Sequence, residues 1–249
     1  MCGSRCRILK WFAWTLRTTS YSCAARCPVT SRPWSSFARR SSSRPVARYD
    51  RKDHFHQRAK REGFRSRAVY KLAELQSGHR ILKSGQRVAD LGCWPGGWLQ
   101  EASRAVGARG RVVGVDLAPV EPPLNNANVI SFVGDIEDAQ VCEQLRTHLG
   151  GRCDVLLSDA APKLTGVREA DRAAEERILE AVEVIIPLLL RKDGDLLVKL
   201  LECPEAQNFQ RRMRACFASA KTVRAAATRK GSSERYLLAR GYKPTETDS

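Results

Sequence analysis

The chain has 249 residues, of which 43% are hydrophobic, and this suits one sizeable globular domain with a tail. Lys and Arg number 43 against 27 Asp and Glu, a formal net charge of +16 that favours an acidic partner such as nucleic acid. The richest late apolar run, ILEAVEVIIPLLL, contains two glutamates and is shorter than the roughly 20 residues that span a bilayer, so no membrane span is expected. The nine cysteines include no C-x-x-C pair and the four histidines form no metal pattern, so no metal site is expected.

Residues 1–49 differ from the rest of the chain because they contain ten basic residues, nine serines and no acid. Such a segment is typical of an organelle transit peptide. We expect a mitochondrial (matrix) address, with a chloroplast address as the alternative; a basic arm that binds RNA directly is a third interpretation. The predicted organisation is a disordered transit peptide over 1–49, a folded domain over 50–244 and a short tail over 245–249.

After residue 50 the sequence alternates between helical and strand-like patterns. Two helical pieces, broken near Gly63, come first. Apolar and β-branched runs then predict seven strands, at 87–91, 111–116, 128–134, 153–158, 194–199, 219–224 and 235–240. This alternation predicts an α/β fold with a mostly parallel sheet and helices on both faces. A short connection joins the last two strands, so we expect them to form an antiparallel hairpin at one end of the sheet.

The first predicted strand leads into a glycine-rich turn, DLGCWPGGW, and a helix follows it. Glycines at such a turn allow the backbone to approach a ligand closely. The spacing G-x-x-x-G-G is not the dinucleotide fingerprint G-x-G-x-x-G. It resembles motif I of the S-adenosylmethionine-dependent methyltransferases; a tight turn without a ligand is the alternative. The resemblance implies S-adenosyl-L-methionine as the cofactor and a binding role for the residues of the turn: Asp90, Gly92, Pro95, Gly96, Gly97 and Trp98.

Acidic residues also stand at the ends of the next two predicted strands. Asp116 lies 26 residues after Asp90, where a carboxylate is placed to accept hydrogen bonds from the ribose of an adenosine-containing ligand. Asp135 ends the third strand and is expected near the adenine by the same logic. Either acid has an alternative role as a turn or helix-capping residue.

Four charged residues fall where this topology brings distant segments together. Lys71 lies on the amino-terminal helix and Asp159 follows the fourth strand, while Lys199 ends the fifth strand and Glu234 opens the last. With RSRAVYKLAEL, DLGCWPGGW, VDLAP, LSDAAPKLTG, LLVKLL and SSERYLLARG in this order, residues 50–244 resemble the FtsJ (RrmJ) family of ribosomal RNA 2′-O-methyltransferases, and among them its mitochondrial members. The resemblance implies a Rossmann-like class I methyltransferase fold with a catalytic Lys-Asp-Lys-Glu tetrad, in which Asp159 also contacts the cofactor.

The tetrad suits a ribose hydroxyl, which is a poor nucleophile facing an already activated sulfonium methyl. The enzyme mainly has to align the reacting atoms and accept a proton. Lys199 is expected to orient the hydroxyl or to take its proton, and the second role would require loss of its charge, which burial or the cation Lys71 favours. Asp159 and Glu234 would oppose that loss while holding Lys199 in place. The loop DAAP, which begins at Asp159, lacks the aromatic residue common in amine methyltransferases, which favours an oxygen acceptor.

Some positions depart from the family pattern. The family usually has small residues at Cys93 and Trp94 and an asparagine at Lys163. Trp94 is expected either to crowd the methionine end of the cofactor or to point outward. These departures concern substrate details and leave the tetrad intact.

Basic residues flank the predicted site from both ends of the domain and are expected to neutralise phosphates with little base discrimination. They are Arg58, Lys60, Arg61, Arg65, Arg67, Lys221, Arg224, Arg229 and Lys230, joined by Arg211, Arg212 and Arg214 unless these form a plain solvated face. The resemblance implies 2′-O-methylation of a ribose, a uridine of the A-loop, in organellar large-subunit ribosomal RNA within a precursor particle, in support of ribosome biogenesis. We expect the protein to be a monomer. A ribosome-assembly factor with this fold and little or no catalysis is the main alternative, and a small-molecule methyltransferase is another.

Overall fold

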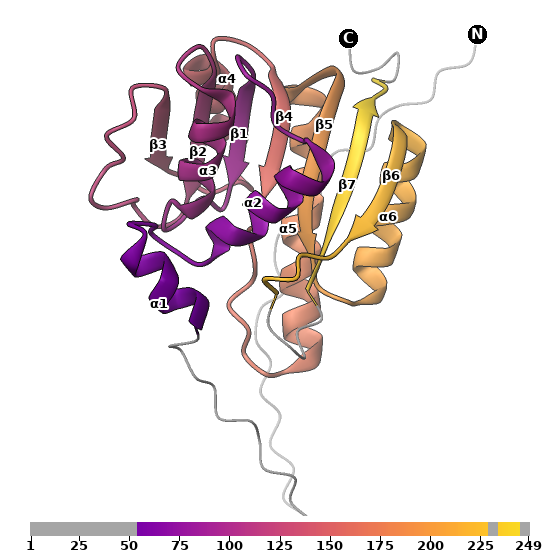
Figure 1. Ribbon diagram of the computed structural model, residues 1–249. Coiled ribbons are helices and arrows are strands. Elements are labelled where there is room, and N and C mark those ends of the chain that lie inside the picture. Colours follow the sequence, from indigo (N-terminus) through magenta and orange to yellow (C-terminus); the bar gives the residue numbers. More distant parts are fainter. Residues whose placement is uncertain (1–53, 229–233, 245–249) are drawn as a thin grey trace, which may run out of the picture. The chain divides into compact units, whose positions relative to one another are not determined.

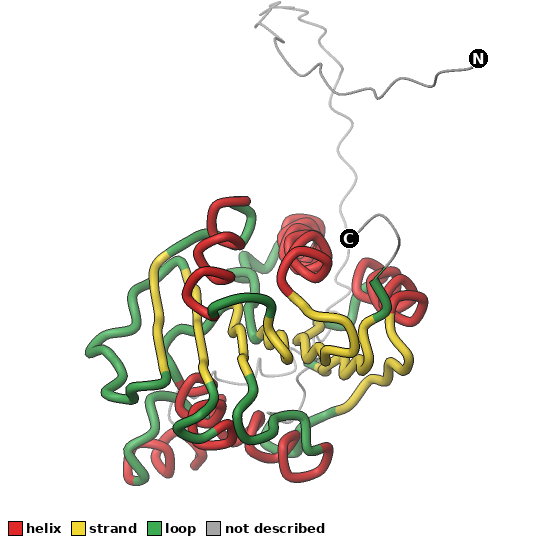
Figure 2. The backbone as a smooth tube through the Cα atoms, turned by 90° about the horizontal axis from the view of Figure 1, so that it is seen from above, coloured by secondary structure: helices red, strands yellow, loops and turns green. Residues whose placement is uncertain are grey.

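The computed structural model describes residues 54–228 and 234–244, which form a seven-stranded sheet with helices on both faces (Figures 1 and 2). The predicted transit peptide (1–49) and tail (245–249) lie outside the described residues, as do Arg229 and Lys230. Within the described part of the chain, no helix is long and apolar enough to cross a membrane.

The sheet has the strand order β3-β2-β1-β4-β5-β7-β6. Strands β3, β2, β1, β4 and β5 are parallel to one another, whereas β7 runs antiparallel to both β5 and β6. The predicted mostly parallel sheet with an antiparallel terminal pair is therefore confirmed. The strands are β1 (Arg87–Leu91), β2 (Arg111–Asp116), β3 (Val129–Val133), β4 (Cys153–Ser158), β5 (Leu190–Leu200), β6 (Phe217–Val223) and β7 (Arg235–Tyr242).

The helices form a layer on each face of the sheet (Figure 2). One buried apolar cluster joins the sheet to α2 and α3, and a second joins the opposite face to α4, α5 and α6. The predicted break near Gly63 separates the first two helices. The helices are α1 (His54–Arg61), α2 (Ala68–His79), α3 (Gly97–Val106), α4 (Ala139–Leu149), α5 (Arg168–Leu189) and α6 (Pro204–Cys216).

Strand β5 begins four residues earlier than predicted and follows α5 without a loop. The polar letters RKDGD resemble a turn, but the strand continues through them, with Arg191, Lys192 and Asp193 exposed and Asp195 half-buried. Leu190 is buried and pairs with Cys153, and the ladder is irregular between Cys153 and Val155. Asp193 takes a left-handed backbone conformation (φ 60°) at this irregularity.

The alternation of side chains along β5 and β7 determines which residues meet beneath α2. Leu197 of β5 and Leu238 of β7 belong to the cluster under α2 and α3. Successive strand residues face opposite sides, so Lys199 shares the face of Leu197, and Tyr236 shares the face of Leu238. Lys199 and Tyr236 are also cross-strand partners, which places both under α2.

Candidate active site

The predicted motifs converge on a pocket at the edge where the parallel strands end. Its volume is about 460 Å³, within the roughly 300–1,000 Å³ typical of small-molecule sites. The residues that line it come mainly from the turns after β1, β2, β3 and β4 and from the end of β5, and they include Gly92, Trp94, Asp116, Leu117, Gly134, Asp135, Asp159, Ala160 and Lys199.

Within the glycine turn, Trp94 and Gly92 line the pocket, and Gly92 also packs on the next loop. Its backbone is left-handed (φ 79°), and an added Cβ would lie 2.6 Å from the Cα of Ala160. The turn after β1 therefore packs directly on the loop after β4. This contact brings the glycine motif and Asp159 to the same pocket.

The remaining residues of the turn support the pocket from outside. A Cβ on Gly97 would lie 2.3 Å from the Oγ of Ser66, so this glycine allows α3 to approach the segment before α2. Trp98 is 2% exposed, donates from Nε1 to the carbonyl oxygen of Ala68 (2.9 Å), and packs against Tyr236. Within the described structure, Pro95, Gly96, Gly97 and Trp98 do not line this pocket. Their predicted contact with the cofactor stays a prediction.

Asp116 and Asp135 line the pocket and also hold their own turns. Asp116 accepts hydrogen bonds from the backbone N–H of Trp94 (2.9 Å) and of Ala118 (3.0 Å). Asp135 accepts one from the N–H of Glu137 (3.0 Å). A carboxylate offers about four acceptor positions, so a role in a turn leaves room for ligand hydroxyls.

Asp90 is fully buried next to this pocket, and its environment indicates which charge a bound ligand should carry. Neither carboxyl oxygen has a hydrogen-bond partner among the described residues. Burial, followed by the charges of Asp159 and Asp116, raises the pKa of Asp90 well above its usual value. A buried carboxyl group of this kind suits a ligand that carries positive charge, as a sulfonium and an amino group do. Among the described residues, no group of His, Cys, Asp or Glu is arranged to hold a metal ion.

The four residues of the predicted tetrad lie together, as two ion pairs. The Nζ of Lys71 lies 2.6 Å from Oε1 of Glu234, and the Nζ of Lys199 lies 3.1 Å from Oδ1 of Asp159. Lys199 also donates to the backbone carbonyl oxygen of Asp159. All four side chains are less than one-fifth exposed. The ion-pair partner of Glu234 is Lys71, and Lys199 also acts on the Glu234 carboxylate electrostatically.

Tyr236, which no sequence motif predicted as a site residue, joins the two ion pairs. Its hydroxyl lies 3.0 Å from Oδ1 of Asp159 and 3.0 Å from Oε1 of Glu234. Burial and the two carboxylates raise the pKa of Tyr236 well above its usual value, so the hydroxyl remains a donor. Burial alone would raise the pKa of Glu234, but Lys71, with further help from Lys199 and Tyr236, lowers it. Alternation along the strand could have indicated Tyr236, because it lies two residues after Glu234 and so faces the same side of the sheet.

The predicted RNA-binding residues have several different environments. Arg65 donates to the carbonyl oxygens of Pro95 and Pro122 and so connects two loops beside the site. Arg58 pairs with Glu62 at the surface, and the Glu183 carboxylate holds Arg212. Exposed basic side chains near the ends of the domain are Lys60, Arg61, Lys221 and Arg224.

The positions that depart from the family pattern also have distinct environments. Trp94 lines the pocket while 58% of it remains exposed, so it projects from the rim. Cys93 is 3% exposed, and burial raises the pKa of its thiol. Lys163 is exposed in the loop after β4.

Known proteins are similar in sequence to this chain over most of the described domain. A family model described as FtsJ-like methyltransferase matches residues 64–242. A ribosomal RNA large subunit methyltransferase E from Methanothermobacter thermautotrophicus is 40% identical over 197 residues, which cover 79% of this chain and 92% of the relative. A protein of the same name from Rhodopseudomonas palustris is 40% identical over 189 residues, covering 74% of this chain and 78% of the relative.

Solved structures share the fold. A crystal structure described as a ribosomal RNA methyltransferase from Plasmodium falciparum matches with a TM-score of 0.64 and 25% identity, over 73% of this chain and all of that one. Fibrillarin from Aeropyrum pernix, solved with bound S-adenosyl-L-methionine, matches with a TM-score of 0.51 and 20% identity, over 69% of this chain and 75% of that one. The second match concerns the class I methyltransferase fold alone. From the family model and the 40% identical relatives, the chain belongs to the FtsJ-like methyltransferase family.

Proposed function

We propose that this protein transfers a methyl group from S-adenosyl-L-methionine to the 2′-hydroxyl of a ribose in large-subunit ribosomal RNA. It is a ribosomal RNA methyltransferase like its relatives. The observation that carries the proposed chemistry is the position of Lys199, which lines the cofactor pocket and is held there by Asp159. A hydroxyl oxygen that contacts the Lys199 ammonium group is thereby brought next to the methyl donor.

The pocket suits this cofactor in size and in chemistry. Asp116 would accept hydrogen bonds from the ribose hydroxyls, and Asp135 lies where the adenine is expected. Gly92 lines the pocket and lets the turn after β1 pack on Ala160, and the buried Asp90 suits the positive end of the molecule. The cofactor supplies a methyl group that its sulfonium sulfur has already activated.

The side chains of the tetrad then orient the acceptor. Lys199 keeps a carboxylate and a carbonyl oxygen as partners, so its amino group would hydrogen-bond the 2′-oxygen and orient it. As the oxygen–methyl bond forms and the carbon–sulfur bond breaks, the hydroxyl proton would pass to water. Asp159 fixes its direction. Glu234 has a lowered pKa and serves as a permanent counter-ion to Lys71 rather than as a proton acceptor.

The finer assignments rest on the resemblance and on the basic amino-terminal segment. We propose a uridine of the A-loop as the target, within a precursor of the large ribosomal subunit, and mitochondria as the location. Fusing residues 1–49 to a fluorescent protein tests the location. Mapping 2′-O-methyl groups on organellar ribosomal RNA, with and without the protein, tests the target. An unchanged methylation pattern would rule out this target.

The enzymatic role is tested with Lys199→Ala. We expect methyl transfer to ribosomal RNA to be lost while the affinity for S-adenosylmethionine, measured by calorimetry, changes little. Lys192→Ala is the matched control, because this exposed lysine lies at the other end of the same strand. Full activity in Lys199→Ala would refute the assigned role. The same variant tests the alternative of a ribosome-assembly factor. If cells that carry Lys199→Ala lose both methylation and ribosome assembly, the role in assembly depends on the catalytic site.

A further inference from the structure

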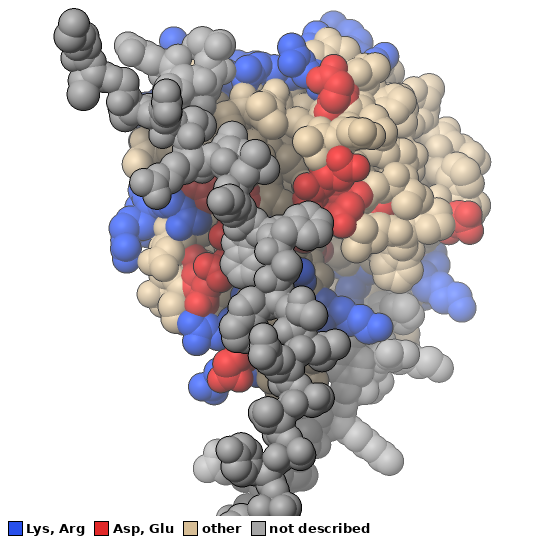
Figure 3. Space-filling view, turned by 180° about the vertical axis from the view of Figure 1, so that it is seen from behind, with Lys and Arg blue, Asp and Glu red and all other residues tan. Residues whose placement is uncertain are grey.

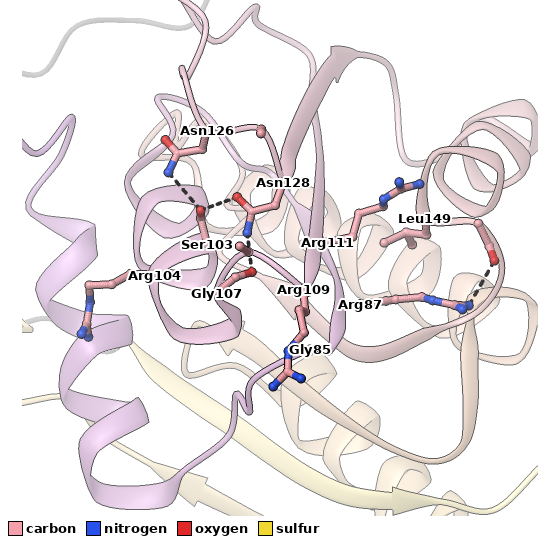
Figure 4. Close-up of a pocket in the computed structure, with 14 residues that line it drawn as sticks. Gly85, Arg87, Ser103, Arg104, Gly107, Arg109, Arg111, Asn126, Asn128 and Leu149 are labelled. Atoms are coloured by element: carbon pink, nitrogen blue, oxygen red, sulfur yellow. Dashed lines mark hydrogen bonds between the residues drawn. The ribbon is translucent and has the colours of Figure 1, made fainter.

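A hollow of about 910 Å³ lies at the opposite edge of the sheet, where the parallel strands begin (Figure 4). Three polar side chains tie its walls together. The Oγ of Ser103 donates to Oδ1 of Asn128 (2.8 Å), and Nδ2 of Asn126 donates to Oγ of Ser103 (3.0 Å). Nδ2 of Asn128 donates to the carbonyl oxygen of Gly107 (2.9 Å). These bonds fix the end of α3 against the segment before β3.

Four arginines line this hollow and no acidic residue does: they are Arg87, Arg104, Arg109 and Arg111. Arg87 and Arg111 are register partners at the starts of β1 and β2, and neighbouring strands lie about 4.8 Å apart. Adjacent like charges repel, so this edge concentrates positive charge. Figure 3 shows several Lys and Arg side chains, with some acidic ones, along the upper rim of the rear face, on the side where these strands begin.

Two of these arginines are anchored to the end of α4. The Nη1 of Arg87 donates to the carbonyl oxygen of Gly150 (3.1 Å), and the Nη1 of Arg111 donates to that of His148 (2.9 Å). A carbonyl is neutral, and one bond uses one of the five N–H donors of a guanidinium. Both side chains are therefore held in place while keeping their full charge and most of their donors.

The other two arginines differ from each other. Arg104 pairs with the buried carboxylate of Glu101 (2.6 Å), which offsets one charge. Arg109 lies in the loop between α3 and β2 and makes no hydrogen bond or ion pair with another described residue. Arg109 is thus the arginine most available to a ligand.

The rest of the lining indicates what that ligand is. It has no aromatic ring on which a base would stack, and its apolar side chains are limited to Leu149 and two alanines. A guanidinium fork matches a phosphate in geometry and charge. We propose that this arginine hollow (Arg87, Arg104, Arg109 and Arg111) binds phosphate groups of an RNA backbone, as a second contact distant from the catalytic pocket.

This inference rests on the proposed function, because it assumes an RNA substrate. The two edges are separated by the length of the strands, about 17 Å for five residues at 3.3–3.4 Å each. A ribosomal RNA domain is larger than that, so one RNA molecule is long enough to reach both sites. Phosphate contacts orient a substrate without reading its sequence, so the hollow would position the RNA while the tetrad acts on one ribose.

The test compares Arg109→Ala and Arg109→Glu with Arg177→Ala and Arg177→Glu. Arg109 is chosen because its loss leaves no described partner unpaired, whereas loss of Arg104 would strand the buried Glu101. Arg177 is an exposed arginine of α5 and matches the change in charge. Affinity for a transcribed fragment of large-subunit ribosomal RNA is measured over a range of salt concentrations, together with methyl transfer and with the affinity for inorganic phosphate.

We expect Arg109→Ala to weaken RNA binding about threefold and to lower the slope of log K against log salt by about 0.7–0.9, the effect of one lost phosphate contact. Arg109→Glu should weaken binding further, and the Arg177 variants should resemble the wild type. Unchanged RNA affinity and slope in both Arg109 variants, while the wild type binds and methylates RNA, overturns the hollow and leaves the proposed function standing. Phosphate binding that depends on Arg109 without any change in RNA binding also overturns it. A wild type that neither binds nor methylates RNA removes the proposed function itself.

Discussion

Replacing Tyr236 with Phe tests whether one hydroxyl joins the two ion pairs of the site. The substitution removes a single oxygen and keeps the ring that packs against Trp98. The hydroxyl lies 3.0 Å from a carboxylate oxygen of Asp159 and 3.0 Å from one of Glu234. It carries one proton, so it donates to one carboxylate at a time.

The magnitude follows from this single charged hydrogen bond. Hydrogen bonds to charged groups contribute about 1.5–3 kcal/mol. Tyr236 itself is fully buried, but Asp159 and Glu234 retain 16% and 14% side-chain exposure, so water partly replaces the lost donor. We therefore expect Tyr236→Phe to lower the free energy of unfolding by about 1.5 kcal/mol, the lower end of that range.

Catalysis should fall as well, because Asp159 loses a contact that fixes the direction of Lys199. A misorientation that costs 1.36 kcal/mol in the transition state slows the reaction about tenfold. We expect kcat to fall about tenfold with little change in KM for S-adenosylmethionine. The assays are urea denaturation and single-turnover methyl transfer to ribosomal RNA.

Tyr70→Phe is the control, because the Tyr70 hydroxyl also donates to a carboxylate, that of Glu62 (2.7 Å), but at the surface. Its loss should cost less than about 1 kcal/mol, as for other exposed charged contacts. Equal, small effects of the two substitutions on stability, with kcat unchanged in Tyr236→Phe, would refute the idea that Tyr236 couples the ion pairs.

Three other substitutions test separate parts of the site. Gly92→Ala should lower the free energy of unfolding by about 1–3 kcal/mol, because the residue has positive φ and its Cβ would overlap Ala160, and urea denaturation measures this; a stable variant would contradict the packing. Asp116→Ala should weaken S-adenosylmethionine binding about tenfold in calorimetry, the effect of about 1.4 kcal/mol of lost hydrogen bonding, while RNA affinity is unchanged. The pKa of Glu234 is lowered in the folded protein, so its stabilising effect is complete above the unfolded pKa of about 4.3 and is lost as the pH falls through the folded pKa. Glu234→Gln should therefore show a smaller loss of stability between neutral and acidic pH than the wild type, and an equal loss would argue against the Lys71 pairing.

The sheet was predictable because its strands are short apolar runs separated by clear turns. Six predicted strands agree with the structure within two residues at their start, and β5 is the exception. There, charged residues occupy strand positions because the ladder with β4 continues past an irregularity. Such pairing depends on a neighbouring strand that is distant in sequence, so local composition does not reveal it.

The site was predictable as a set of residues but not as a set of contacts. Motif positions identified Lys71, Asp159, Lys199 and Glu234, and the structure brings all four together. Which carboxylate pairs with which lysine depends on where α2 crosses the sheet, and tertiary packing alone decides that. Tyr236 was missed because a tyrosine in an apolar strand is ordinarily a core residue, and only its register with Lys199 turns its hydroxyl toward the carboxylates.

The contacts of the site form one chain, in the order Lys71, Glu234, Tyr236, Asp159, Lys199. Its members come from α2, from the start of β7, from the loop after β4 and from the end of β5, so no single element can set the position of Lys199 alone. An acceptor-orienting lysine must stay within a few tenths of an ångström of its productive position. In this buried chain a neutral hydroxyl lies between two carboxylates, and each carboxylate pairs with a lysine at one end. The three inner members each have a partner on either side, which provides that precision. The two lysines are not equivalent: Lys71 ends the chain on α2, whereas Lys199 lines the pocket, and we therefore propose Lys199 as the lysine that contacts the substrate.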